Sequence, residues 1–198
     1  MLLTRKRSGK VKGRLAYNGK PTRDWISKED KSSPTVANDA LMITCAIDAF
    51  EKRDIMSLDV PNAFIQTDAP LKKIGERVVM KIRGRLVDWL VEMAPDAYKN
   101  YIVIENGKRV LYLIILKAIY GMLEASLLWY QKLRADLETL DFVFNPYDAC
   151  VANRLKNNNQ HTIRFHVDDI LSSHVDAKVN DKFAKWTQKN MERLRMSK

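Results

Sequence analysis

Apolar residues recur along this chain with two spacings, one typical of helices and one typical of strands. Helical spacing predicts helices over residues 37–53, 86–93, 123–140 and 178–195. Compact apolar runs predict strands over residues 11–17, 55–60, 77–82, 102–105, 109–113, 151–155 and 161–167. Asn106 and Gly107 separate two of these strands and predict a hairpin there. The order of elements predicts an α+β fold, in which helices back one face of an antiparallel sheet.

The charge of the chain narrows the choice of partners. An apolar content of 46% over 198 residues is enough for one folded domain. The net charge of +10 favours a polyanionic partner, nucleic acid first and an anionic membrane second. Residues 1–33 hold ten Lys/Arg against three Asp/Glu and therefore carry +7 of this charge. A surface that is merely solubilising is the alternative explanation.

The cysteines and histidines indicate neither a disulfide framework nor a zinc site. Cys45 and Cys150 lie far apart and outside any CxxC pattern, which favours small buried thiols in a reduced, intracellular protein. His161, His166 and His174 match no compact zinc-ligand spacing. No apolar run is long enough to span a bilayer, and the N-terminus is not typical of a secretory signal. We therefore expect no membrane partner and no secretion.

Two adjacent carboxylates, Asp168 and Asp169, follow His166 and Val167 between two apolar runs. Because adjacent like charges repel and carboxylate oxygens suit Mg²⁺, a divalent cation is the simplest compensation. An ordinary Asp-Asp hairpin turn is the alternative. Chemistry at this point needs a third carboxylate, and Asp59 offers one at the end of a hydrophobic strand. If the two elements lie side by side, three acids converge on one sheet face and can hold two Mg²⁺ ions.

Four segments, in chain order, resemble copia-type LTR retrotransposon reverse transcriptases. Asp59-Val60-Pro61-Asn62-Ala63-Phe64-Ile65 is similar to the family's Asp-Val-x-x-Ala-Phe-Leu. Residues 118–125, together with Trp129, are similar to its Leu-Tyr-Gly-Leu-Lys-Gln-Ala-Pro-x-x-Trp segment. Residues 146–151 loosely match its Asp-Pro-Cys-Leu element, and residues 166–169 correspond to its Tyr-Val-Asp-Asp. The matches span roughly residues 11–176.

The resemblance implies part of an RNA-directed DNA polymerase from a Pol polyprotein. It implies a palm, with an antiparallel sheet backed by helices, and a fingers subdomain. The fingers would comprise roughly residues 1–53 and 70–126, and the palm residues 54–69 and 127–198, within one partial domain. We expect a chain truncated after the palm hairpin, without the thumb, ribonuclease H, integrase or protease segments of such polyproteins.

The resemblance also implies the metal ligands. Asp59 and Asp168 would be the principal ligands of two Mg²⁺ ions, with Asp169 beside them and the Val60 carbonyl as a backbone ligand. Mn²⁺ is the expected substitute for Mg²⁺. In this arrangement the metals activate a primer 3′-hydroxyl and stabilise the leaving pyrophosphate.

The same resemblance assigns the nucleotide pocket. Phe64 would stand against the sugar 2′ position and exclude ribonucleotides, although a core aromatic is the alternative. Tyr120 and Gly121 would line the pocket and approach the template strand. Lys12 and Arg14 match the family's basic pair, which can meet the incoming triphosphate. A basic strand that is merely exposed to solvent is an almost equally favoured explanation for these two residues.

The chain departs from the family pattern at the catalytic hairpin and before the longest helix. His166 replaces the family's Tyr, and histidine can still pack and donate a hydrogen bond at this position. Glu124, Ser126 and Leu127 replace Gln, Pro and Arg, which removes a cation from the nucleotide side and adds an anion. These changes bear on template and nucleotide contacts more than on metal binding.

Three functions are compatible with these residues. The leading hypothesis is a reverse transcriptase that adds deoxynucleotides to a primer on an RNA or DNA template. Its partners would be primer-template, deoxynucleotides and either a second copy or the remaining polyprotein domains, in the cytoplasm, a virus-like particle or the nucleus. The second is a degenerate, non-catalytic remnant that binds nucleic acid through its basic segments. A two-metal nuclease is a distant third.

Overall fold

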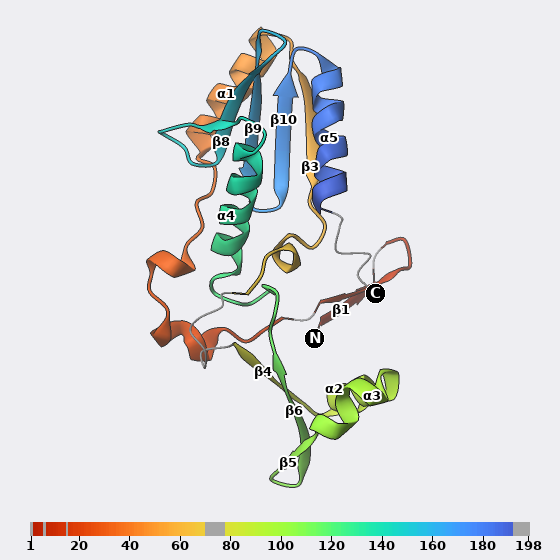
Figure 1. The fold of residues 1–198 in the computed structure, drawn as a ribbon. Helices are drawn as coiled ribbons and strands as arrows, with labels where there is room; N and C mark the ends of the chain where they lie inside the picture. The colour runs from red at the N-terminus through yellow and green to blue at the C-terminus, as the bar shows by residue number, and fades with distance from the viewer. Residues whose placement is uncertain (1, 6, 15, 70–77, 192–198) are drawn as a thin grey trace. The chain divides into compact units, whose positions relative to one another are not determined.

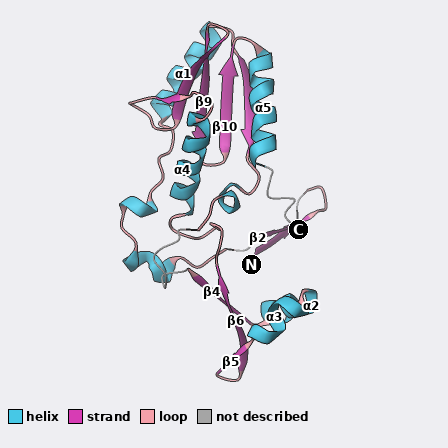
Figure 2. Ribbon diagram, in the orientation of Figure 1, coloured by secondary structure: helices cyan, strands magenta, loops and turns pink. Residues whose placement is uncertain are grey.

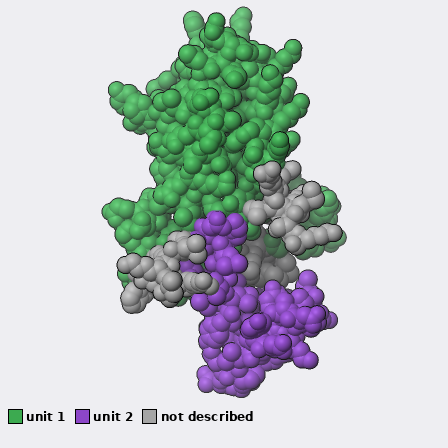
Figure 3. Space-filling model, in the orientation of Figure 1, with its two compact units in different colours: residues 1–67, 119–198 green, residues 68–118 purple. Residues whose placement is uncertain are grey.

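The structure of the protein is a computed structural model that describes residues 2–5, 7–14, 16–69 and 78–191. The chain forms two compact units (Figure 3). The first unit combines Met1–Thr67 with Ile119–Lys198, and the second comprises Asp68–Ala118. The assignment of fingers and palm to parts of the chain stays a prediction.

A five-stranded antiparallel sheet forms the centre of the first unit, with strand order β3-β10-β9-β8-β7 (Figures 1 and 2). The strands are β3 (Asp54–Asp59), β7 (Val143–Phe144), β8 (Val151–Lys156), β9 (Asn159–His166) and β10 (Asp169–His174). A hairpin of β1 (Leu2–Arg5) and β2 (Val11–Arg14) also belongs to this unit. So do the 3-10 helices η1 (Lys20–Trp25), η2 (Glu29–Lys31) and η3 (Ala63–Gln66).

One face of this sheet packs against two helices, α4 (Ala125–Glu138) and α5 (Ala177–Met191). Strand β9 contributes Ile163 and Phe165 to the shared core. The helices contribute Trp129, Tyr130, Leu133, Leu137, Phe183 and Met191. Because side chains of a strand alternate between faces, Thr162 and Arg164 lie on the opposite face of β9.

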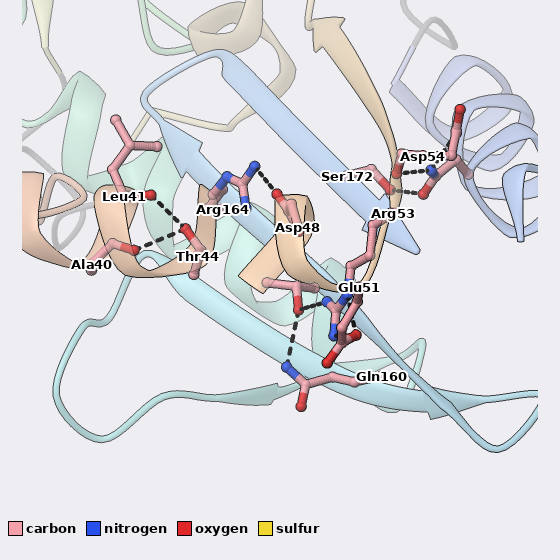
Figure 4. A network of polar contacts seen from close by, with 12 residues as sticks. Ala40, Leu41, Thr44, Asp48, Glu51, Arg53, Asp54, Gln160, Arg164 and Ser172 are labelled. Carbon is pink, nitrogen blue, oxygen red and sulfur yellow. Dashed lines mark hydrogen bonds and ion pairs between the residues drawn. The ribbon is translucent and has the colours of Figure 1, made fainter. Parts of the chain in front are cut away.

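The opposite face is partly covered by α1 (Asn38–Phe50), so the expectation of helices on one face was wrong in this respect (Figure 1). Arg164 donates a hydrogen bond to Asp48 of α1 at 2.5 Å, and both side chains are buried (Figure 4). A buried arginine needs a charged partner, and α1 provides it. The apolar stripe that predicted this helix is largely exposed, including Met42 and Phe50.

The second unit is a three-stranded antiparallel sheet, order β4-β6-β5, packed against a short helix. Its strands are β4 (Val79–Arg83), β5 (Val103–Glu105) and β6 (Lys108–Ile114). Its helices are α2 (Arg85–Met93), α3 (Pro95–Tyr98) and the 3-10 helix η4 (Lys99–Tyr101). Ile82, Val87 and Leu111 form its buried core.

The sequence pattern located most of these elements. The helices predicted over 37–53, 86–93 and 123–140 and the hairpin at Asn106 are confirmed within a few residues. The last helix is described from Ala177 to Met191, and its predicted continuation to residue 195 lies outside the described residues. Cys150 is buried as expected, whereas Cys45 is exposed because it lies on the outer side of α1. Among the described residues, no helix combines the length and apolar character needed to cross a membrane.

Candidate active site at the end of the five-stranded sheet

The turn between β9 and β10 carries the two adjacent carboxylates. His166 pairs with Asp169, so Val167 and Asp168 form a two-residue hairpin loop. Val167 has a left-handed φ of +57°, whereas Asp168 has no positive φ. Of the two turn types common in two-residue hairpins, these φ signs match type II′, whose first central residue is usually glycine, and not type I′. A valine in this conformation costs about 1–3 kcal/mol, which other contacts must offset.

Strand β3 brings the third predicted carboxylate to this turn. Asp59 is the register partner of Asp169, and the Val60 N–H donates to the Asp168 carbonyl oxygen at 3.1 Å. That bond makes Asp59 and Asp169 a non-hydrogen-bonded pair, in which the Cα atoms are about 4.5 Å apart and the side chains share one face. Both residues are exposed, while Asp168 is half-buried.

Two like charges placed opposite each other on neighbouring strands are unfavourable. A divalent cation relieves this repulsion, and carboxylate oxygens are the donors that Mg²⁺ prefers. The pair of Asp59 and Asp169 therefore fits a metal chemically. Within the described part of the chain, however, no group of three or more His, Cys, Asp or Glu side chains is arranged to hold an ion. Asp168 contributes its backbone to the pairing of the strands, and its role as a third ligand stays a prediction.

The side chains of Phe64 and Tyr120 contact each other near this end of the sheet. Phe64 lies in η3, which follows Asp59 by a few residues, and Tyr120 precedes α4. Their rings make an edge-to-face contact with centroids 4.7 Å apart. Phe64 is half-buried and packs against the core, whereas Tyr120 is 41% exposed. The structure therefore brings together two of the residues predicted to line a nucleotide pocket.

Gly121 lies where two loops of the backbone approach each other closely. The Tyr17 N–H donates to the Tyr120 carbonyl oxygen at 2.7 Å, and Gly121 has a φ of +90°. A Cβ atom on Gly121 would lie 2.0 Å from the Tyr17 carbonyl oxygen, and one on Gly19 would lie 2.4 Å from the Gly121 carbonyl oxygen. Only glycine fits at these two positions. The sequence predicted a role for Gly121 in the nucleotide pocket but none for Gly19. The sequence feature that could have indicated Gly19 is its position in a turn beside Asn18.

The predicted basic pair is not tied to this site by the structure. Lys12 and Arg14 lie on β2, opposite Thr4 and Leu2, but their side chains are outside the described residues. Their contact with a triphosphate stays a prediction. Glu124, which replaces a glutamine of the family pattern, is 9% exposed and precedes α4 as its N-cap residue.

Two residues that received no role from the sequence prove important for the geometry. The Trp129 indole N–H donates to the Val167 carbonyl oxygen at 2.7 Å. Asp148 accepts hydrogen bonds from the backbone N–H groups of Ala37 and Cys150, each at 2.8 Å, and so joins α1 to the start of β8. Burial, with Asp148 nearby, raises the pKa of the Cys150 thiol to about 12, so this thiol stays protonated. Both Trp129 and Asp148 fall in segments with family resemblance, and this was their only signal.

Comparison with known proteins supports part of the sequence resemblance. The chain is 25% identical over 162 residues to the retrovirus-related Pol polyprotein from transposon RE2 of Arabidopsis thaliana, a match that covers 82% of the chain. The polyprotein from transposon RE1 of the same plant matches with the same identity and coverage. The matched region is only 10% of each relative's length. No protein-family model and no solved structure matches the chain. Over most of its length the chain is thus distantly similar to two retrovirus-related Pol polyproteins from plant transposons.

Proposed function

We propose that this chain is the fingers and palm part of the reverse transcriptase of a copia-type Pol polyprotein. The observation that carries the proposal is the register of β3 and β10, which sets Asp59 opposite Asp169 next to the turn of Asp168. This register puts the three carboxylates of the proposed motifs at one end of one sheet. Asp59 and Asp169 are nevertheless 110 positions apart in the chain. The distant similarity to Pol polyproteins supports the same reading.

In this proposal the three carboxylates hold two Mg²⁺ ions, with Mn²⁺ as a substitute. When bound, such ions activate a primer 3′-hydroxyl and stabilise the leaving pyrophosphate. The chain itself contributes position, because β3 and β10 are fixed by their ladder. The open sheet face beyond α1 presents Ser57 and Asp59, both exposed. A primer end that reached this face would meet the carboxylates without any rearrangement of the sheet.

The nucleotide would lie beside Phe64 and Tyr120. The edge-to-face contact fixes the Phe64 ring, so it can act as a rigid wall against the sugar. The close backbone approach at Gly121 fixes the loop that carries Tyr120. Lys12 and Arg14 are proposed to meet the triphosphate, and the net charge of +10 to attract primer-template.

Replacing Asp59 with asparagine tests the proposal. We expect Mn²⁺ at a hundredfold excess over its Kd to stabilise the wild-type chain by about 2.7 kcal/mol. This stabilisation should raise the melting temperature of the chain. Asp59→Asn should abolish most of this shift and lower primer extension about a hundredfold or more at low salt. Asp181→Asn, which removes an exposed carboxylate from α5 on the helix-covered side, is the matched control. Equal metal shifts and equal extension in the wild type and Asp59→Asn would refute the assigned role.

A non-catalytic nucleic-acid-binding remnant is the second candidate, because the net positive charge alone supports binding. It predicts salt-sensitive binding to primer-template with no metal-dependent change in melting temperature. The same titration of Mn²⁺ against the wild type separates the two candidates.

A further inference from the structure

We infer that Trp129 is a positioning residue that selects the turn type at Val167 and Asp168 and thereby sets the direction of the Asp168 carboxylate. Its consequence for metal binding rests on the function proposed above, whereas its consequence for the turn does not. Trp129 is 1% exposed and lies on α4, among core residues of the same helix. An indole N–H is a donor only, and a buried one needs an acceptor. Its acceptor is the Val167 carbonyl oxygen, at 2.7 Å.

That carbonyl belongs to the central peptide of the turn. Two-residue hairpin loops adopt type I′ or type II′ turns, which differ by a flip of this peptide. The flip would reverse the Val167 carbonyl and give Asp168 a positive φ, which aspartate tolerates. The observed turn has a positive φ at Val167 alone. The competing conformation is therefore accessible to this sequence, and the bond from Trp129 to the Val167 carbonyl oxygen opposes it.

The choice of turn matters for the carboxylates because it changes the backbone of Asp168. In the observed turn the Asp168 carbonyl accepts from the Val60 N–H, which ties the turn to β3. A flipped central peptide would rotate the Asp168 side chain relative to Asp59. Trp129 reaches the turn from a helix on the far face of the sheet, so it acts on the site without touching a ligand. Outer contacts of this kind typically change metal affinity by about tenfold to a hundredfold.

Trp129→Phe tests the inference, because it keeps an aromatic ring in the core but removes the N–H. We expect it to weaken Mn²⁺ binding to the full 198-residue chain about tenfold. Adding Val167→Gly should restore most of the affinity, because glycine at the first central position favours the type II′ turn by itself. A loss caused by core packing would not be rescued by a glycine in the turn. Trp186→Phe is the matched control, since Trp186 also packs against the core but stacks on Phe183 of α5.

A second readout needs no metal. The backbone amide resonances of Asp168 and Asp169 should shift in Trp129→Phe and return toward wild-type positions in the double variant. Wild-type Mn²⁺ affinity in Trp129→Phe, or no return of these amides in a folded double variant, would overturn the inference. If the wild type binds no Mn²⁺, the proposed function fails, and the amide shifts still decide the role of Trp129. The two failures are therefore distinguishable.

Discussion

Acidification should destabilise this protein because His161 is buried in its neutral form. The ring is fully buried in the sheet core, where Phe142 and Phe183 pack around it. Arg154 donates a hydrogen bond to Nδ1 at 3.2 Å, so Nε2 carries the proton and lies 2.8 Å from the Ser172 hydroxyl oxygen. A second proton on this ring would face the Arg154 guanidinium without an acceptor.

Burial lowers the pKa of His161 from 6.5 to about 3, and repulsion from Arg154, His174, Arg53 and Lys156 acts in the same direction. In the unfolded chain the pKa is about 6.5. Between pH 6.5 and about pH 3, the unfolded chain therefore binds a proton at His161 that the folded chain does not bind. The free energy of unfolding should fall by about 1.4 kcal/mol for each pH unit in this window, or about 2.7 kcal/mol between pH 7.5 and 4.5.

The assay is urea denaturation of the wild type and His161→Gln at pH 7.5, 6.5, 5.5 and 4.5. Glutamine can accept from Arg154 and donate to Ser172 but does not titrate. The variant should be less stable at pH 7.5, because a smaller side chain replaces a packed ring. Other groups titrate in both proteins, so their effects cancel when the two free energies of unfolding are subtracted. The wild type should therefore exceed the variant in free energy of unfolding by about 2.7 kcal/mol less at pH 4.5 than at pH 7.5. A difference that stays constant across this range would refute the buried, neutral histidine.

Two further substitutions test the packing that supports the site. Asp48→Ala should cost about 3–5 kcal/mol in urea denaturation, because it leaves Arg164 buried without a charged partner. Adding Arg164→Met should recover most of that loss, and failure to recover would contradict the buried ion pair. Gly121→Ala should cost about 2–4 kcal/mol, because a Cβ atom would lie 2.0 Å from the Tyr17 carbonyl oxygen. Gly107→Ala, which has a positive φ but open space around it, should cost only about 1 kcal/mol; equal losses would rule out the clash.

Local patterns were sufficient to predict most helices and hairpins of this protein. Asn106 and Gly107 both have positive φ, as the hairpin signal requires. Asn157 and Asn158 also adopt positive φ and close β8 onto β9 with only two residues, where the sequence suggested a longer polar loop. The additional ladder pairs come from the ability of asparagine to adopt this conformation, which a simple reading of polarity overlooks.

Long-range packing could not be derived from the same patterns. The spacing in α1 predicted a helix correctly, but the buried side of that helix carries Asp48, whose partner Arg164 is 116 positions away. A charged residue on a helix normally predicts solvent exposure. Only the fold shows that the two charges meet beneath the sheet. Likewise, the adjacency of β3 and β10 was expected from motif resemblance and could not be derived from hydrophobic spacing.

The register of β3 and β10 is fixed by polar contacts at the end of the sheet opposite the carboxylates. Asn180 of α5 donates to both the backbone and the side-chain oxygen of Asp54, at 2.9 and 2.7 Å, and accepts from Ser172 at 2.8 Å. These bonds hold the first residues of β3 to the last residues of β10. A slip of one residue would move Asp59 to the other face of the sheet and break these bonds of the buried Asn180 and Ser172 side chains. Because a buried polar group without a partner costs about 1–3 kcal/mol, the polar contacts that include His161 and Asn180 favour the register that sets Asp59 opposite Asp169.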